Sequence, residues 1–392
     1  MNQLLYEGRT LVGMVSSIIR QDALRVPYNR LDWERMFRLA DYHRVANIIY
    51  LGVLGKGDVL PDRWRTRFFE RYQESLLFGE NCQESLREVL TWLDMREISC
   101  TVLTSASIRE LYTIPETAEN TPVQILLDEE QYYLAKGYLV DLGYETDQVY
   151  KGYGERMRKT SGVSVILYQK LPFRIPGYVK SIQKLLETAS LDEPFVYVRM
   201  LPEESEYIYR MARAVYGYVT DELRLREILD LQLCHQAWRD EMDKENVRKW
   251  LEEFQIDELG DKLLRIAYMW FGDKKDKYFI ENDQPEDMSV FDILEDRLLT
   301  QGEINREIDE QALKLEKALL KEQDKERRTE GMLMFRDKLM NNLAAFQKKL
   351  RWMFPDYHYM SSIYPAVEKL PVLLPVFWGI RAIRLLLRIF TR

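Results

Sequence analysis

The chain has 392 residues, of which 46% are hydrophobic and 31% charged, as in a globular protein with room for roughly two to three domains. Its net charge of −8 argues against a general nucleic-acid binder, because such a protein needs a basic face. The three cysteines lie far apart in the sequence, which predicts free thiols in a reducing compartment. The N-terminal segment has no apolar core behind a basic start, so we expect a cytoplasmic protein and not a secreted one.

Residues 1–95 are predicted to be helical. Two runs, LDWERMFRLADYHRVANIIYLGVL and RWRTRFFERYQESLLFGENCQESLREVLTWL, carry apolar residues at the spacing of one helix face. A Gly-Lys-Gly turn and Pro61 separate them. We therefore expect an N-terminal helical region over residues 1–95.

The pattern changes over residues 96–201, where short β-branched runs alternate with helical ones. Four segments are predicted as strands: 98–105, 122–128, 162–169 and 193–201. The segment before the third, YGERMRKTS, can be its hairpin partner, and helical segments follow the first and second strands. This order predicts a small mixed β-sheet in an α+β core flanked by mainly helical N- and C-terminal regions.

Residues 202–330 are predicted as a helical domain, and residues 331–392 as a basic extension that ends in an amphipathic helix. The extension has ten Lys or Arg against three acidic residues, so it carries about +7 and the rest of the chain about −15. Its eleven-residue uncharged run is shorter than the roughly twenty residues of a membrane span. Basic residues recur at helical spacing, namely Arg381, Arg384, Arg388 and Arg392. The helix can dock on the acidic body of its own chain or on an anionic membrane surface.

Few catalytic schemes fit the residues present. The three histidines, His43, His235 and His358, form no zinc-binding spacing with one another or with cysteines. No GxSxG nucleophile elbow, P-loop or dinucleotide-binding GxGxxG occurs. The sequence therefore predicts no bound metal and no resident cofactor.

Five segments in order carry a family resemblance: DWERMFRLADYHRVANIIY, TVLTSASIRELY, PVQILLDEEQYYLAKGYLVDLGY, LRLREILDLQL and YPAVEKLPVLLPVFWGIRAIR. The chain resembles the uncharacterised nucleotidyltransferase family, a bacterial branch of the polymerase-beta-like superfamily. The resemblance covers most of the chain. It implies a nucleotidyltransferase-like core at residues 96–201.

Nucleotidyl transfer uses two Mg²⁺ ions that carboxylates on neighbouring strands hold. The resemblance places the family's Asp-x-Asp pair on Pro122 and Gln124, which provide no anionic ligand. It places the Lys-Gly of a phosphate-side turn on Thr104 and Ser105, and a Glu-x-His pair on Ile166 and Tyr168. Three parts of one site thus differ from the family's pattern at the same time. We therefore expect this chain to be a family member that has lost two-metal nucleotidyl transfer.

An active transferase with displaced ligands is the alternative. It would use Mg²⁺ and a nucleoside triphosphate, held by Asp128 with Glu129 or Asp230, and would modify a small molecule or a protein. The simpler interpretation is that Asp128 caps the helix behind it.

Other polar residues have two interpretations as well. Thr104, Ser105 and Ser107 can hold an anion or cap a helix. Arg226 and Asp230 can pair structurally across one helical turn or face a site.

For an inactive family member we expect a protein partner. Residual nucleotide binding is possible, and we expect no binding to a specific nucleic acid. A further alternative is a peripheral membrane protein with weak surface contact through the basic C-terminal helix.

Overall fold

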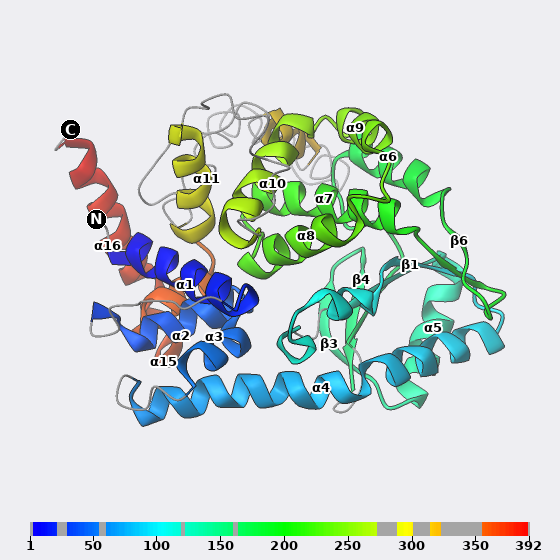
Figure 1. Cartoon of the computed structure of the whole chain (residues 1–392), viewed down its shortest axis with the longest axis horizontal. Helices are drawn as coiled ribbons and strands as arrows, with labels where there is room; N and C mark the ends of the chain where they lie inside the picture. The colour runs from blue at the N-terminus through cyan, green and yellow to red at the C-terminus, as the bar shows by residue number, and fades with distance from the viewer. Residues whose placement is uncertain are drawn as a thin grey trace, which may run out of the picture. The chain divides into compact units, whose positions relative to one another are not determined.

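The computed structural model describes residues 3–21, 30–54, 60–118, 122–159, 164–272, 288–300, 314–322 and 355–390 (Figure 1). Contacts within the chain divide it into two compact units, each built from separate stretches of sequence. Unit 1 comprises residues 1–69, 216–228 and 265–392, and unit 2 comprises residues 70–215 and 229–264. The four regions predicted from the sequence, 1–95, 96–201, 202–330 and 331–392, divide the chain differently, and they stay a prediction.

Unit 2 contains a seven-stranded mixed sheet with the order β3-β4-β5-β2-β1-β7-β6. Its strands are β1 (Cys100–Thr104), β2 (Val123–Leu127), β3 (Glu145–Tyr150), β4 (Gly154–Arg158), β5 (Val165–Tyr168), β6 (Ser190–Leu191) and β7 (Val198–Met200). β2 runs parallel to β5, and β1 runs parallel to β7, whereas the other neighbouring pairs are antiparallel. The predicted α+β class with a mixed sheet and helical flanks is confirmed.

One face of this sheet is the core of unit 2. Side chains alternate between the two faces of a strand, so Val123, Ile125 and Leu127 of β2 share one face. They pack with buried residues of β1, β5 and β7, and with α4 (Asp62–Met95) and α5 (Glu129–Asp141). Gln124 points to the opposite face, where it meets α7 (Glu203–Thr220).

Helices complete unit 2. They are α6 (Pro176–Leu186), α9 (Lys244–Glu253), and the parts of α4, α7, α8 (Leu225–Trp238) and α10 (Asp257–Phe271) that belong to this unit. The segment predicted as a helix after the first strand, residues 106–114, contains the 3-10 helix η2 (Ala106–Leu111), and a second one, η3 (Pro115–Thr117), follows it. Asp243 begins α9 by accepting hydrogen bonds from two backbone amides of its first turn.

Unit 1 is helical in the part of the chain that the structure describes. Its helices include α1 (Gln3–Ile19), α2 (Trp33–Tyr42), α3 (Ala46–Val53), α11 (Met288–Thr300), α14 (Tyr357–Ile363), α15 (Pro365–Lys369), η5 (Pro371–Leu373) and α16 (Leu374–Phe390). Asp32 caps α2 through its side chain. Phe37 of α2 packs edge-on against Phe68, with ring centroids 5.0 Å apart, which supports an aromatic core in this unit.

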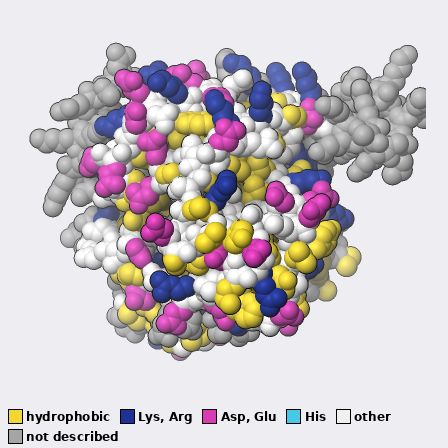
Figure 2. All heavy atoms as spheres, turned by 90° about the vertical axis from the view of Figure 1, so that its right-hand side faces the viewer, with side chains coloured by type: hydrophobic (Ala, Val, Ile, Leu, Met, Phe, Trp, Pro, Cys, Tyr) yellow, Lys and Arg dark blue, Asp and Glu magenta, His cyan; other side chains and the backbone are white. Residues whose placement is uncertain are grey.

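The surface shows no dominant charge of one sign on the face drawn in Figure 2, where basic and acidic side chains are interspersed with hydrophobic ones. Among the described helices, none combines the length and the apolar character that crossing a bilayer demands.

Candidate functional site

Four polar side chains lie on one face of α7 in unit 2. Tyr209 and Arg210 lie three and four residues after Glu206, and Arg213 lies three residues after Arg210, so the four side chains project on the same side of the helix. Their hydrogen bonds reach β1, β2 and β5, which places this face of α7 over the end of β1 and the start of β2. This region is where the resemblance locates the family's active site.

Gln124 of β2 is the centre of the first group of contacts. Its side-chain oxygen Oε1 accepts a hydrogen bond of 2.9 Å from Nη1 of Arg213 and another of 3.0 Å from the hydroxyl of Tyr209. The same nitrogen of Arg213 lies 3.5 Å from the hydroxyl of Tyr168 at the end of β5. We call Gln124, Tyr168, Tyr209 and Arg213 the Gln124 cluster.

Burial keeps the hydroxyl of Tyr209 protonated. Gln124, Tyr168 and Tyr209 are buried, whereas Arg213 is half-buried. Burial raises the pKa of Tyr209 well above that of free tyrosine, and the nearby charge of Arg213 lowers it by less. The Tyr209 hydroxyl is therefore protonated and donates to Gln124.

Glu206 is the centre of the second group. Its oxygen Oε1 accepts a hydrogen bond of 3.0 Å from the backbone N–H of Ser105, where β1 ends. Arg210, one turn along α7, donates to the same carboxylate from Nε at 2.9 Å, and its Nη2 lies 3.4 Å from the carbonyl oxygen of Ser105. Burial lowers the pKa of Arg210, but the charge of Glu206 and other nearby groups raises it more, so the guanidinium stays charged. The pair therefore fixes the turn after β1.

The Gln124 cluster does not fit a magnesium ion. Mg²⁺ takes hard oxygen ligands, usually from one or two carboxylates and from phosphates. Pro122, buried just before β2, has no ligand atom in its side chain, and the oxygen of Gln124 already accepts from two donors, one of them a cation. Ile166 on β5 is buried and apolar. Within the described ranges, no group of three or more His, Cys, Asp and Glu residues is arranged to hold a metal ion.

The acidic residues of the displaced-ligand alternative lie elsewhere. Asp128 and Glu129 are exposed at the carboxyl end of β2, whereas Gln124 lies near its amino end. Four residues of extended strand separate Asp128 from Gln124 by about 13 Å. Asp230, on α8, is buried and accepts a hydrogen bond from the hydroxyl of Tyr112. No contact described here brings these carboxylates together.

Asp128 occupies the N-cap position of α5, but its side chain makes no capping hydrogen bond. Its backbone carbonyl accepts from the amides of Gln131 and Tyr132, at 3.0 and 2.9 Å. Asp128 therefore stands at the predicted cap position, but the first amides of the helix bond to its backbone carbonyl and not to its carboxylate.

The hydroxyl residues after β1 take local partners. Thr104 is buried, and its hydroxyl accepts from the backbone N–H of Gln124 at 3.3 Å. Ser105 precedes η2 without a capping hydrogen bond from its side chain, because its hydroxyl bonds to that of Ser107. The carboxylate that the amide of Ser105 contacts is Glu206 of the same chain.

Arg226 belongs to unit 1, where it is buried. Its guanidinium donates to the carbonyl oxygen of Arg44 at 2.9 Å and to the side-chain oxygen of Asn47 at 2.8 Å. These contacts tie the start of α8 to Arg44, which precedes α3, and to Asn47 in the first turn of α3. They give the arginine a structural role, and its predicted pairing with Asp230 stays a prediction.

The basic residues of the C-terminal helix have different environments. Arg381 is buried, with its guanidinium 5.5 Å from the ring centroid of Tyr359, whereas Arg384 is exposed and donates to the hydroxyl of Tyr364 at 3.3 Å. The side chain of Arg388 and all of Arg392 lie outside the described residues.

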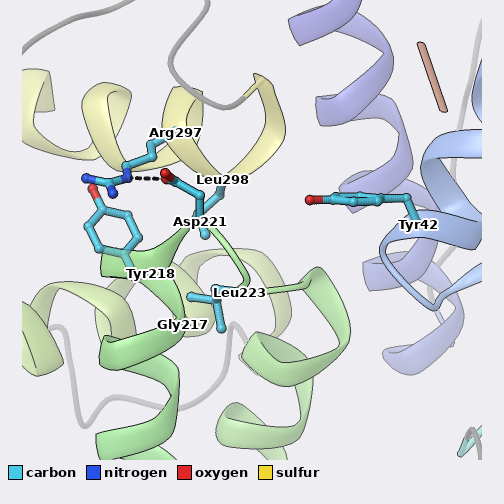
Figure 3. Close-up of a pocket in the computed structure, with 7 residues that line it drawn as sticks. All are labelled: Tyr42, Gly217, Tyr218, Asp221, Leu223, Arg297 and Leu298. Atoms are coloured by element: carbon cyan, nitrogen blue, oxygen red, sulfur yellow. Dashed lines mark hydrogen bonds and ion pairs between the residues drawn. The ribbon is translucent and has the colours of Figure 1, made fainter. Parts of the chain in front are cut away.

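A small pocket in unit 1 provides no room for a nucleotide (Figure 3). Its space is about 10 Å³, roughly that of one water molecule. Arg297 donates to Asp221 across one wall at 3.0 Å, and its Nη2 lies 3.1 Å from Glu316. Seven residues line it: Tyr42, Gly217, Tyr218, Asp221, Leu223, Arg297 and Leu298. The guanidinium of Arg297 is thus paired with both carboxylates.

Sequence reasoning missed the polar face of α7, because the segment YIYRMARAVYGYV reads as a core helix. The available signal was the placement of Glu206, Arg210 and Arg213 at positions i, i+4 and i+7 in an otherwise apolar helix. A charged stripe of this kind must either face water or pair inside the protein.

A comparison with models of protein families identifies the family of this chain. The model of a family described as uncharacterised nucleotidyltransferase matches residues 29–272, which is more than half of the chain. No curated protein and no solved structure matches the chain.

Proposed function

Because this chain belongs to the uncharacterised nucleotidyltransferase family, we propose that it has lost two-metal nucleotidyl transfer and acts as a binding, regulatory or assembly protein. The observation that carries the proposal is the pair of hydrogen bonds that Gln124 accepts from Tyr209 and Arg213. In this proposal Gln124 stands at a position where the family has a metal-binding aspartate.

Arg213 supplies the second part of the argument. A catalytic Mg²⁺ would need an anionic oxygen near position 124, but this chain places a guanidinium 2.9 Å from the oxygen of Gln124. Two cations about 4 Å apart repel each other by several kcal/mol at the effective dielectric of a protein site. The arginine therefore takes the electrostatic role of a metal ion and stabilises the scaffold without one.

Glu206 supplies the third part. In the resembling family the turn after the first strand lies on the phosphate side of the site. Here the amide of Ser105 at that turn donates to Glu206. A phosphate at the same amide would have to displace a carboxylate that is buried and paired with Arg210. Both ends of the ancestral site are thus held by side chains of the chain itself.

The proposed partner is a protein, and the proposed compartment is the cytoplasm. Cys100 and Cys234 are buried free thiols in the described structure, which agrees with a reducing compartment.

A transfer assay tests the proposal. The protein is incubated with each of the four nucleoside triphosphates, labelled at the α-phosphate, and with Mg²⁺ or Mn²⁺. A cell extract provides small-molecule and protein acceptors. We expect no more label transfer than with heat-denatured protein.

Variants decide the origin of any label transfer that is seen. If the displaced-ligand alternative holds, Asp128→Asn should abolish label transfer. The control variant Asp147→Asn, which changes an exposed carboxylate of β3, should leave label transfer intact. That result would overturn the proposal.

A further inference from the structure

The C-terminal helix α16 of unit 1 packs through a polar and aromatic face. Arg381 is buried over the ring of Tyr359, and the indole N–H of Trp378 donates to the carbonyl oxygen of Pro355 at 3.0 Å. The ring of Phe377 lies against that of Tyr364, with centroids 4.8 Å apart. These contacts decide which side of α16 faces the rest of its unit.

The opposite side of α16 and of the preceding turn is aliphatic and exposed. The residues on it are Val372, Val376, Ile380 and Ile383, with exposed fractions of 85, 56, 37 and 58%. Spacings of four, four and three residues align them along one side of a helix. We call these four residues the α16 stripe.

This arrangement is the reverse of the usual one. An amphipathic surface helix normally turns its apolar stripe to the core and its charges to water. Here an arginine is buried and four aliphatic side chains in a line are exposed to water. Single exposed aliphatic residues are normal on a protein surface, but an aligned group of them marks an interaction site. The α16 stripe therefore fits an apolar environment outside the chain.

The charge of the helix indicates what that environment is. From residue 374 to residue 390 the sequence contains three arginines and no acidic residue. Arg384 is exposed next to the stripe, and Lys369 is exposed just before it. The nearby carboxylate of Glu368 is paired with Arg38 at 2.5 Å.

We propose that the α16 stripe docks on an anionic lipid surface, with the helix lying in the plane of the interface. The aliphatic side chains enter the boundary between headgroups and acyl chains, while the flanking basic side chains contact anionic headgroups. The contact of Arg381 with Tyr359 holds the helix in the orientation that exposes the stripe. The proposal is independent of whether the α7 region retains catalysis.

Co-sedimentation with vesicles tests the proposal, using the full chain and vesicles of phosphatidylcholine alone or with about one third phosphatidylserine. We expect binding to the phosphatidylserine vesicles that weakens as salt is raised. We expect Val376→Asp to reduce it at least tenfold. The matched control is Val140→Asp, because Val140 is also an exposed valine on a helix, at 52% against 56%. It should bind like the wild type.

Three outcomes would overturn the proposal. The first is a wild-type chain that sediments with neither vesicle. The second is equal loss in the two variants when circular dichroism shows both to be folded. The third is a wild-type dimer that Val376→Asp converts to a monomer, because the stripe would then be an interface between two copies.

Discussion

Arg213 donates a 2.9 Å hydrogen bond to the side-chain oxygen of Gln124, and thereby joins α7 to the second strand of the sheet. The two residues are 89 positions apart in sequence. Tyr209 donates to the same oxygen, so one neutral amide satisfies two donors from one helix. The proposed function depends on this relationship, because in that proposal an amide and an arginine stand where the family has a carboxylate and a metal.

Removing the shared acceptor should destabilise the fold. Gln124→Met keeps the length of the side chain but leaves two donors without this partner, so we expect a loss of about 1–3 kcal/mol in the free energy of unfolding. Gln124→Glu keeps an acceptor and places a negative charge beside Arg213, so it should lose much less. Urea denaturation of the two variants measures both values. Equal stability of Gln124→Met and the wild type would show that the cluster contributes nothing.

Breaking the buried ion pair on α7 should cost more. Glu206→Gln leaves the buried guanidinium of Arg210 without its charged partner, and the expected loss is about 3–5 kcal/mol. The matched control is Glu252→Gln, which removes an i,i+4 pair with Arg248 whose side chains are 80 and 51% exposed. Exposed pairs contribute about 0–1 kcal/mol, so the control should unfold close to the wild type. Similar losses in both variants would contradict the role given to Glu206.

Stability should depend on pH through His43. Burial lowers its pKa to about 3, with a smaller contribution from the charge of Arg224, against about 6.5 in the unfolded chain. Below pH 6.5 only the unfolded state takes up this proton. The free energy of unfolding therefore falls as the pH drops from about 6.5 toward 3, by up to about 1.4 kcal/mol per pH unit, and its full value is present above pH 7.

The variant His43→Gln isolates this contribution. The ring nitrogen Nδ1 of His43 accepts from the backbone N–H of Leu225 at 3.3 Å, and a glutamine keeps an acceptor without a titrating group. Between pH 5 and 6.5 the variant should show a smaller loss of stability than the wild type, measured by denaturation at each pH. Identical pH profiles would mean that His43 does not titrate as proposed.

The buried thiols should be unreactive in the native protein. Burial raises the pKa values of Cys100 and Cys234 to about 12, so almost no thiolate forms at neutral pH. Both should resist maleimide labelling at pH 7.5 until the chain is unfolded, as mass spectrometry of peptides would show. Labelling at the same rate in native and unfolded protein would contradict the burial of these residues.

The sequence predicted those strands whose buried side chains form a run of β-branched or aliphatic residues. The strands predicted at 98–105 and 122–128 correspond to β1 and β2, whose core residues are β-branched or aliphatic apart from Cys100. β3 (Glu145–Tyr150) was missed, because an edge strand that is exposed along almost its whole length has no apolar alternation. β6 has only two residues, too few for any periodic signal.

The candidate site was only partly predictable, for a related reason. The family resemblance singled out Gln124 as a position that departs from a metal-binding pattern. It provided no information about Arg213 and Tyr209, because their contacts with β2 depend on how α7 packs over the sheet. Such long-range packing has no local sequence signature, and a charged residue inside an apolar helix is the only hint.

In the proposed function the chain does not use Mg²⁺ to handle a nucleotide. The most direct measurement is a thermal-shift titration of the wild-type protein with ATP, GTP, CTP and UTP, each with and without Mg²⁺. A ligand that binds the folded state raises the melting temperature by an amount that grows with its affinity. We predict no Mg²⁺-dependent rise with any of the four, even if a small metal-independent rise occurs. A clear rise that requires Mg²⁺ would contradict the claim and restore the transferase with displaced ligands.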